Sequence, residues 1–284
     1  MLRATTMALA MLLAASTLSA QPLEGRLKRI ASTKTITLAY RADATPFSYV
    51  NEKKEIVGFS IDLCRRVAQS IEAQLKLKDL RVQLVPVTVQ TRFDAVSSGK
   101  ADMECGSSTV TLSRMKQVDF SSFIFVESTG LLAKAAAGLG SLQNLAGKKI
   151  SVVAGTTNER ALRAQLSAQK VNATVVPFKS RDEAFGALVG DKVDAFASDK
   201  LLLIGAVSTS KDQKFYLLPD QLSFEPYAIV LPRNDSSFRL AVNTALSRIF
   251  GSGEIMKLHN HWFAQFGDPG EVAKLTYLLG TIPD

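Results

Sequence analysis

The chain has 284 residues, of which 46% are apolar, and a formal net charge of +8 at pH 7. This length suits two compact lobes or one large α/β domain, and two cysteines are too few for a fold built on disulfides. The positive charge favours anionic ligands, but no dense Lys/Arg run is interleaved with aromatic residues, so we expect no nucleic-acid partner.

The first twenty residues, MLRATTMALAMLLAASTLSA, have the pattern of a cleaved secretory signal peptide. Arg3 precedes an apolar run over residues 7–15, and small residues lead to an expected cleavage site after Ala20. No stretch of the sequence reaches the roughly 20 apolar residues of a membrane-spanning helix. We therefore expect residues 1–20 to be removed and the remainder to be an exported, free protein.

Strand and helix periodicities alternate along the rest of the chain. In the first half they predict strands over 35–40, 81–87 and 101–105, a hairpin over 51–59, and helices over 60–75 and 90–100. After a Gly/Ala-rich connection they predict strands over 150–155, 173–178 and 193–199, and helices over 156–169, 180–192 and 200–207. A strand over 224–235 and helices over 237–250 and 253–266 complete the order. This alternation predicts parallel strand pairing in an α/β fold.

The two halves repeat the same order of elements without a sequence repeat, which indicates two similar lobes. The chain is expected to cross between them near residues 125–132 and again near 221–229. We therefore predict lobe 1 over residues 21–128 and 224–284 and lobe 2 over 129–223. Each lobe is expected to be a mostly parallel sheet flanked by helices, with a two-stranded hinge between the lobes.

Polar and charged residues stand where the predicted strands end, and ligands of open α/β sheets bind beyond these ends. The candidate residues are Arg41, Arg92, Ser107, Thr109, Arg114, Thr156, Thr157, Arg181 and Asp199. Guanidinium groups can grip a carboxylate with two parallel bonds, and the helix start after Gly155 also favours an anion. Asp199 can bind an ammonium group, so the set suits a small zwitterion with an additional carboxylate. A plain helix cap at Thr156 and surface roles for single arginines are the alternatives.

Other kinds of site have little support in the sequence. No nucleophile–base pair and no Gly-rich phosphate motif occurs, and His259 and His261 lack further ligands at metal-site spacing, so we expect no metal and no cofactor. Enzymatic chemistry would depend on carboxylates such as Asp62 and Glu104, which read better as a helix start and a strand residue.

Cys64 lies in a helical pattern and Cys105 at a strand end. Two buried thiols are favoured over a disulfide, although an oxidising compartment allows the pair to form.

Five motifs resemble those of the periplasmic amino-acid-binding proteins of ABC importers, the family 3 solute-binding proteins. They are PFSYVNEKKEIVGFSIDLC, ECGSSTVTLSRMKQVDFSSFIFV, LAGKKISVVAGTTNE, GDKVDAFASD and SGEIMKLHNHWF. The motif of small hydroxyl residues, an arginine and an apolar DFS end is the most specific of them. Within the family the chain is most similar to the glutamate/aspartate-binding branch.

The resemblance implies a monomeric two-lobed periplasmic clamp that delivers an acidic amino acid to the permease of an ABC importer. It implies that Arg114 binds the α-carboxylate, together with N–H groups near Ser107 and Thr157. Asp199 and Thr109 would bind the α-ammonium group. Arg41 and Arg92 would bind the side-chain carboxylate.

Two positions depart from the branch pattern, because Val89 stands for a serine and Arg181 for a histidine. If Arg181 points into the cleft, a longer or more anionic ligand becomes possible. The alternatives are a periplasmic enzyme on the same scaffold, similar to cyclohexadienyl dehydratase, and a ligand-binding sensor module.

Overall fold

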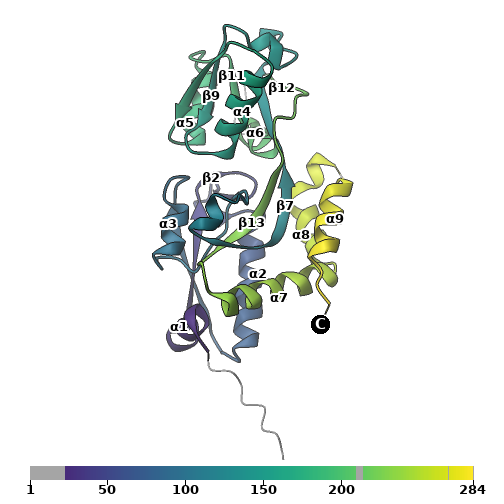
Figure 1. The fold of residues 1–284 in the computed structure, drawn as a ribbon. Helices are drawn as coiled ribbons and strands as arrows, with labels where there is room; N and C mark the ends of the chain where they lie inside the picture. Colours follow the sequence, from purple (N-terminus) through teal and green to yellow (C-terminus); the bar gives the residue numbers. More distant parts are fainter. Residues whose placement is uncertain (1–22, 209–213, 268, 284) are drawn as a thin grey trace, which may run out of the picture.

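The structure, a computed structural model, describes residues 23–208, 214–267 and 269–283. The predicted signal peptide lies outside these ranges. The chain forms two lobes, one above the other in Figure 1, and strands β7 and β13 run between them. Across the described ranges, every helix is too short or too polar to span a bilayer.

Lobe 1 is built around a five-stranded sheet with the order β5-β1-β6-β13-β7. Its strands are β1 (Thr35–Arg41), β5 (Arg81–Val87), β6 (Met103–Glu104), β7 (Asp119–Glu127) and β13 (Glu225–Leu231). Strand β1 pairs in parallel with β5 and β6, whereas β13 pairs antiparallel with β6 and β7. The parallel pairings bring the carboxyl ends of β1, β5 and β6 to one edge of the sheet.

Lobe 2 repeats this plan in a sheet with the order β10-β9-β11-β8-β12. Its strands are β8 (Thr129–Lys134), β9 (Lys149–Val153), β10 (Thr174–Phe178), β11 (Ala195–Asp199) and β12 (Phe215–Leu217). Strand β9 pairs in parallel with β10 and β11, and β8 pairs antiparallel with β11 and β12.

Both sheets are therefore mixed, and the expectation of a mostly parallel sheet holds for only half of the pairings in each. The antiparallel pairings come from the strands on either side of the two crossings. Sheet membership changes between Glu127 and Thr129, and again between Leu217 and Glu225. The predicted lobe boundaries at residues 128/129 and 223/224 are compatible with these changes of sheet membership and stay a prediction.

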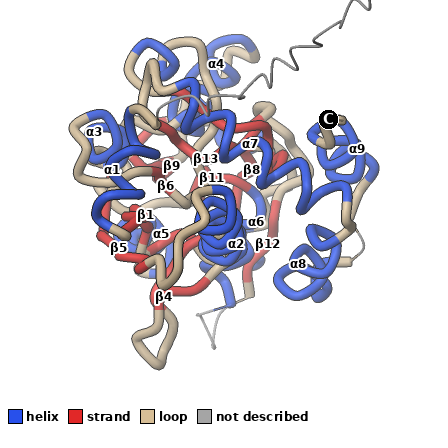
Figure 2. Tube along the Cα trace, turned by 90° about the horizontal axis from the view of Figure 1, so that it is seen from below, coloured by secondary structure: helices blue, strands red, loops and turns tan. Residues whose placement is uncertain are grey.

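Helices cover the sheets on both sides. Lobe 1 carries α1 (Gly25–Thr33), α2 (Phe59–Gln74), α3 (Arg92–Ser97), α7 (Ser236–Gly251), α8 (Glu254–Phe263) and α9 (Glu271–Gly280). Lobe 2 carries α4 (Thr157–Ala168), α5 (Arg181–Val189) and α6 (Lys200–Ser208). A small sheet of β2 (Asp43–Ala44), β3 (Ser48–Val50) and β4 (Ile56–Val57) follows β1. Helices α8 and α9 lie at the opposite edge of the molecule from α1 and α3 (Figure 2).

The core of lobe 1 contains an aromatic cluster in which Phe47 and Phe125 are packed 5.0 Å apart, centroid to centroid. His259 is buried and stacks against Phe125, so it is a core histidine. The lobe 2 core is formed by aliphatic residues of β8, β9, β11 and α4.

Apolar side chains also cross between the lobes. Val89, which follows β5 in lobe 1, packs in a lobe 2 cluster with Val153 and Phe196, and Leu202 of α6 packs in the lobe 1 core. A Cβ atom on Gly205 would lie 2.4 Å from the carbonyl oxygen of Thr45, so α6 approaches this loop more closely than any side chain would permit. The two lobes are therefore in contact, and the cleft between them is closed.

Cys64 in α2 and Cys105 after β6 form a disulfide. The interpretation of these residues as two buried thiols is therefore wrong. The sequence did not show that the middle of α2 and the end of β6 lie against each other, with their Cα atoms 6.2 Å apart. The disulfide joins the helix to the segment that carries Ser107 and Thr109.

Removing this disulfide should lower the free energy of unfolding, because it closes a loop of 41 residues in the unfolded chain. Chain entropy predicts a loss of about 4 kcal/mol for the double variant Cys64→Ala/Cys105→Ala. Denaturant unfolding, followed by circular dichroism, measures it. Reductant should destabilise the wild type and leave the double variant unchanged. An unfolding free energy equal in both proteins would contradict the prediction.

Candidate functional site

The predicted strand-end residues of both lobes meet in the closed cleft. From lobe 1 come the end of β1, the start of α3 and the loop after β6. From lobe 2 come the starts of α4 and α5 and the end of β11. The hydroxyl oxygens of Thr109 and Thr157 lie 3.3 Å apart across the cleft, and Gln90 Nε2 donates to the carbonyl oxygen of Lys179 at 3.3 Å. One site is thus assembled from two lobes.

Three arginines are withdrawn from water at one end of the cleft. Arg41, Arg92 and Arg181 are only 1%, 3% and 4% exposed. Among the described residues no hydrogen-bond acceptor reaches Nε and Nη1 of Arg41, Nε of Arg92, or Nε and Nη1 of Arg181. A buried guanidinium group with unused donors is costly, and an anionic ligand would supply the missing acceptors.

Arg41 and Arg92 remain cations at neutral pH. Burial, with the adjacent charge of Arg181, lowers the pKa of Arg41 to about 10. Burial and the charge of Arg114 lower the pKa of Arg92 to about 10. Mutual repulsion among the arginines and loss of water thus act in the same direction, and a bound carboxylate would relieve both.

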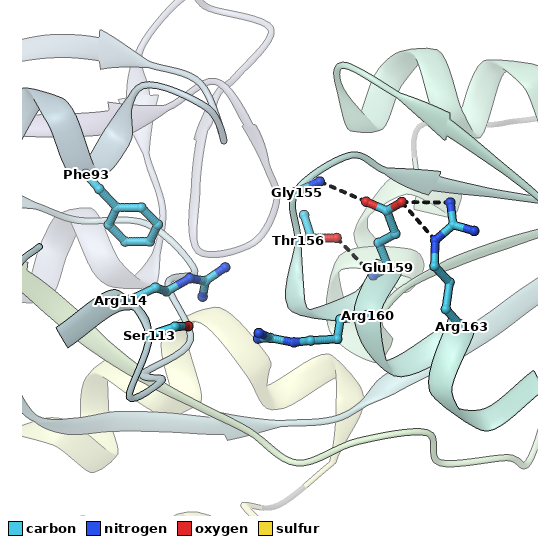
Figure 3. Close-up of a pocket in the computed structure, with 8 residues that line it drawn as sticks. All are labelled: Phe93, Ser113, Arg114, Gly155, Thr156, Glu159, Arg160 and Arg163. Carbon is cyan, nitrogen blue, oxygen red and sulfur yellow. Dashed lines mark hydrogen bonds and ion pairs between the residues drawn. The ribbon is translucent and has the colours of Figure 1, made fainter. Parts of the chain in front are cut away.

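Arg114 lies nearer to solvent, at the mouth of the cleft. Its Nη1 donates to the carbonyl oxygen of Thr109 at 2.7 Å, and its guanidinium group lies 5.0 Å from the centroid of the Phe93 ring. Here a cavity of about 550 Å³ lies between the lobes, and Arg160 of α4 points across it toward Arg114 (Figure 3). Burial and the Arg160 charge lower the pKa of Arg114. An anion entering here meets positive charge from both lobes.

The hydroxyl groups of the two threonines at the start of α4 make different contacts. Thr156 Oγ1 donates to the carbonyl oxygen of Val153 and accepts from the backbone N–H of Glu159, so its hydroxyl caps the helix. Gly155 permits this turn, since its φ is +75°. Thr157 instead directs its hydroxyl to Thr109. Of the predicted pair, Thr157 faces the cleft and Thr156 follows the helix-cap alternative.

The loop after β6 alternates as an extended chain should. In the described chain the buried Ser107 hydroxyl makes no hydrogen bond, whereas Ser108 donates to Oε2 of Glu104 at 2.6 Å. Glu104 is fully buried, and its charge acts on both Arg41 and Arg92. It is a strand residue, as interpreted, but it also balances part of the arginine charge.

Acidic groups gather at the opposite end, beside the hinge. Asp199 accepts from Asn158 Nδ2 at 3.0 Å, and Glu225 accepts from Thr109 Oγ1 at 2.6 Å. Burial, with the charge of Glu225, raises the pKa of Asp199 to about 6. Burial, with the charge of Asp199, raises the pKa of Glu127 to about 7. A cation placed among these groups would favour their ionised forms.

The sequence did not reveal four residues of this site: Asp43, Asn158, Glu225 and Tyr227. Asp43 lies in a short hairpin strand, and Asn158 is the second residue of a helix. Glu225 and Tyr227 belong to the returning strand β13, whose antiparallel direction brings its start, and not its end, to the cleft. A search of strand ends alone therefore misses them. Acidic residues occur at both predicted crossings, and this pattern could have identified Glu225 from the sequence.

The predicted arginines Arg41, Arg92 and Arg181 thus form one charged group of the cleft, and the predicted Asp199 forms a second with Glu127 and Glu225. The arrangement can hold a zwitterion that carries a further anionic group. Two positions depart from the branch pattern. Val89 makes an apolar contact between the lobes, and Arg181 is buried in the cleft.

Replacing Asp199 with Asn should stabilise the ligand-free protein at neutral pH. The folded-state pKa of Asp199 is raised, so the folded protein binds more protons than the unfolded chain between about pH 4 and 6, and stability falls as pH rises through this window. Asp199→Asn should remove that decline and raise the free energy of unfolding by about 2 kcal/mol at pH 7.5, with no difference at pH 4.

Unfolding curves of protein refolded without ligand, recorded from pH 4 to 8, measure this effect. The control is Asp191→Asn, because the Asp191 side chain is 80% exposed in lobe 2 and its removal should leave the pH profile unchanged. An Asp199→Asn profile that still follows the wild type would contradict the assigned burial of charge.

A family model described as bacterial extracellular solute-binding proteins, family 3, matches residues 36–265. A protein of Pseudomonas aeruginosa named L-glutamate/L-aspartate-binding protein is 37% identical over 248 residues, covering 87% of this chain and 82% of the relative. The glutamate/aspartate import solute-binding protein of Escherichia coli is 32% identical, over 84% of this chain and 79% of its own length.

Solved structures agree on the fold. An ancestral arginine-binding protein bound to arginine has a TM-score of 0.72 and 28% identity, covering 81% of this chain and 98% of its own. An ancestral amino-acid-binding protein, described as a precursor of cyclohexadienyl dehydratase, has a TM-score of 0.74 and 26% identity, covering 84% of this chain and all of its own. With its two lobes, its closed cleft and these matches, the chain belongs to the bacterial extracellular solute-binding proteins of family 3.

Proposed function

We propose that the protein captures L-glutamate or L-aspartate in its cleft and delivers it to the permease of an ABC importer. The observation that carries this proposal is the pair of charged ends. Three buried arginines with unused donors lie at one end, and Asp199 and Glu225 lie at the other. The relatives named for glutamate and aspartate support the same ligand class.

Each group of an acidic amino acid has a partner in this arrangement. Arg114 binds the α-carboxylate, assisted by the backbone near Ser107 and by the start of α4. Asp199 binds the α-ammonium group, and Glu225 positions the Thr109 hydroxyl beside it. Arg41 and Arg92 bind the side-chain carboxylate through nitrogens for which residues 23–208, 214–267 and 269–283 provide no acceptor. Charge complementarity at both ends therefore selects the ligand.

Capture requires the lobes to separate and close, and β7 and β13 are the strands about which they would move. A ligand that bridges the lobes binds the closed form better than the open form, so binding shifts the population toward closure. We further propose that the protein acts as an exported periplasmic monomer after removal of residues 1–20. The lobe division at residues 128/129 and 223/224 belongs to the same proposal.

An enzyme on this scaffold is the competing function. It requires a group that transfers a proton at the ligand, and Asp199 is a buried carboxylate of the cleft with a raised pKa. Asp199 accepts from Asn158, which suits it to hold a cation. Absence of turnover of a cyclic dicarboxylate, followed by absorbance, supports the binding function, whereas turnover would overturn it.

Acidic amino acids should raise the melting temperature more than other ligands. A panel of neutral, basic and acidic L-amino acids and of dicarboxylates without an ammonium group is measured by thermal shift. A ligand present at about a hundred times its Kd stabilises the folded state by roughly 2.7 kcal/mol. A shift with basic or neutral amino acids and none with L-glutamate or L-aspartate would contradict the proposed ligand class.

Removing one charge from either end should weaken binding of L-glutamate by about 30-fold or more, because truncating one partner of a buried charge pair costs roughly 2 to 5 kcal/mol. Arg92→Ala and Asp199→Ala are measured by isothermal titration, with the exposed Asp191→Asn as the control that keeps wild-type affinity. A loss smaller than tenfold in both variants would be evidence against the assigned contacts.

A further inference from the structure

Asp43 contacts arginines of both lobes at the end of the cleft where the side-chain carboxylate of the ligand is proposed to bind. This side-chain end contains Arg41, Arg92 and Arg181. Its Oδ1 accepts from Nη2 of Arg41 at 2.5 Å, within lobe 1. Across the cleft its Oδ2 accepts from the backbone N–H of Arg181 at 3.2 Å, and Arg181 Nη1 lies 3.9 Å from its Oδ1. One carboxylate therefore joins the first residue of α5 in lobe 2 to the end of β1 in lobe 1.

This contact is largely shielded from water. The Asp43 side chain is 12% exposed, and those of Arg41 and Arg181 are 1% and 5% exposed. Burial alone would raise the pKa of Asp43, but the charges of Arg181 and Arg41 hold it below its usual value. The residue is thus a carboxylate at neutral pH, and a buried charge of this kind is strongly bound by its partners.

The charges at this end of the cleft nearly balance. Arg41, Arg92 and Arg181 provide three positive charges, and the carboxylates that act on Arg41 and Arg92 belong to Asp43 and Glu104. Asp182, at the start of α5, is exposed, and its charge also acts on Asp43, Arg41 and Arg181. Among the buried groups an excess of one positive charge remains, which one ligand carboxylate neutralises.

Asp43 also occupies donors that a larger anion would need. Arg41 Nη2 and the backbone N–H of Arg181 are already bound to it, and the unused donors are Nε and Nη1 of each arginine. A ligand group with three oxygens and two charges would compete with Asp43 and would bring a second negative charge beside it.

We propose that Asp43 is a specificity-determining residue, which holds the lobes together through Arg181 and limits the side-chain end of the cleft to one ligand carboxylate. This inference rests on the proposed function. It extends that function to a ligand whose side chain carries a single negative charge. Arg181, instead of enlarging the pocket for a more anionic ligand, is held by the protein's own carboxylate.

The test compares L-glutamate with O-phospho-L-serine. The two have side chains of similar length, but a phosphate carries about −1.5 to −2 charges at pH 7. Isothermal titration gives the ratio of their affinities for the wild type, Asp43→Asn and Asp43→Ala. The matched control is Asp191→Asn, which removes an exposed carboxylate from an ion pair within lobe 2.

The wild type should bind L-glutamate at least 100-fold more tightly than O-phospho-L-serine. Both Asp43 variants should narrow this ratio by at least tenfold, and Asp191→Asn should leave it unchanged. The contact between lobes is tested by the dissociation rate of L-glutamate. Asp43→Asn should raise it at least fivefold in the wild-type background and less than twofold in an Arg181→Gln background, where the ionic partner in the other lobe is already absent.

An unchanged ratio in the Asp43 variants, or an equal effect of Asp43→Asn in both backgrounds, overturns the inference and leaves the proposed function standing. If one Asp43 variant fails to fold, the other variant and Arg181→Gln still test the inference. Arg181→Gln should lower the affinity for O-phospho-L-serine below that of the wild type. If the wild type binds neither L-glutamate nor L-aspartate, the proposed function falls, and the inference falls with it.

Discussion

The structure depends on the withdrawal of charged groups from water where the two lobes meet. Arg41, Arg92 and Arg181 are buried there, and several of their nitrogens have no acceptor in the described chain. At the acidic end the ionised forms are also disfavoured, because burial and mutual repulsion raise the pKa of Asp199 and Glu127. The arginine nitrogens lack acceptors in the described chain and the acidic groups repel one another, so the closed form is complementary to a ligand that carries both signs of charge.

The fold explains why these groups come together. In each lobe the parallel strands end at the edge that faces the other lobe, and the antiparallel strands β7 and β13 connect the two edges. Glu127 and Glu225 are direct neighbours on these strands, so acidic groups lie at the hinge itself. The positive groups are placed at the end of β1 and at the starts of α3 and α5. The two charged groups thus come from different elements of the fold.

Sequence reasoning found the parallel strands, most of the helices and the arginines, because each has a local signal. Periodicity marks the elements, and a charged residue at a strand end marks the cleft. Helices α1 and α9 were not predicted, since α9 exposes Leu275, Leu278 and Leu279 and its apolar pattern does not mark a buried face. The disulfide and Asp43 were missed for another reason. Each depends on a contact between segments far apart in the chain, which no local pattern encodes.

The close approach of Gly205 to Thr45 bears on affinity, although neither residue belongs to the charged ends of the cleft. Together with Val89 and Leu202, it packs the two lobes against each other. The apparent Kd of a two-state clamp is the intrinsic Kd divided by the fraction of molecules already in the binding-competent state. Packing at these positions favours the closed arrangement, so the apparent Kd depends partly on residues outside the charged ends of the cleft.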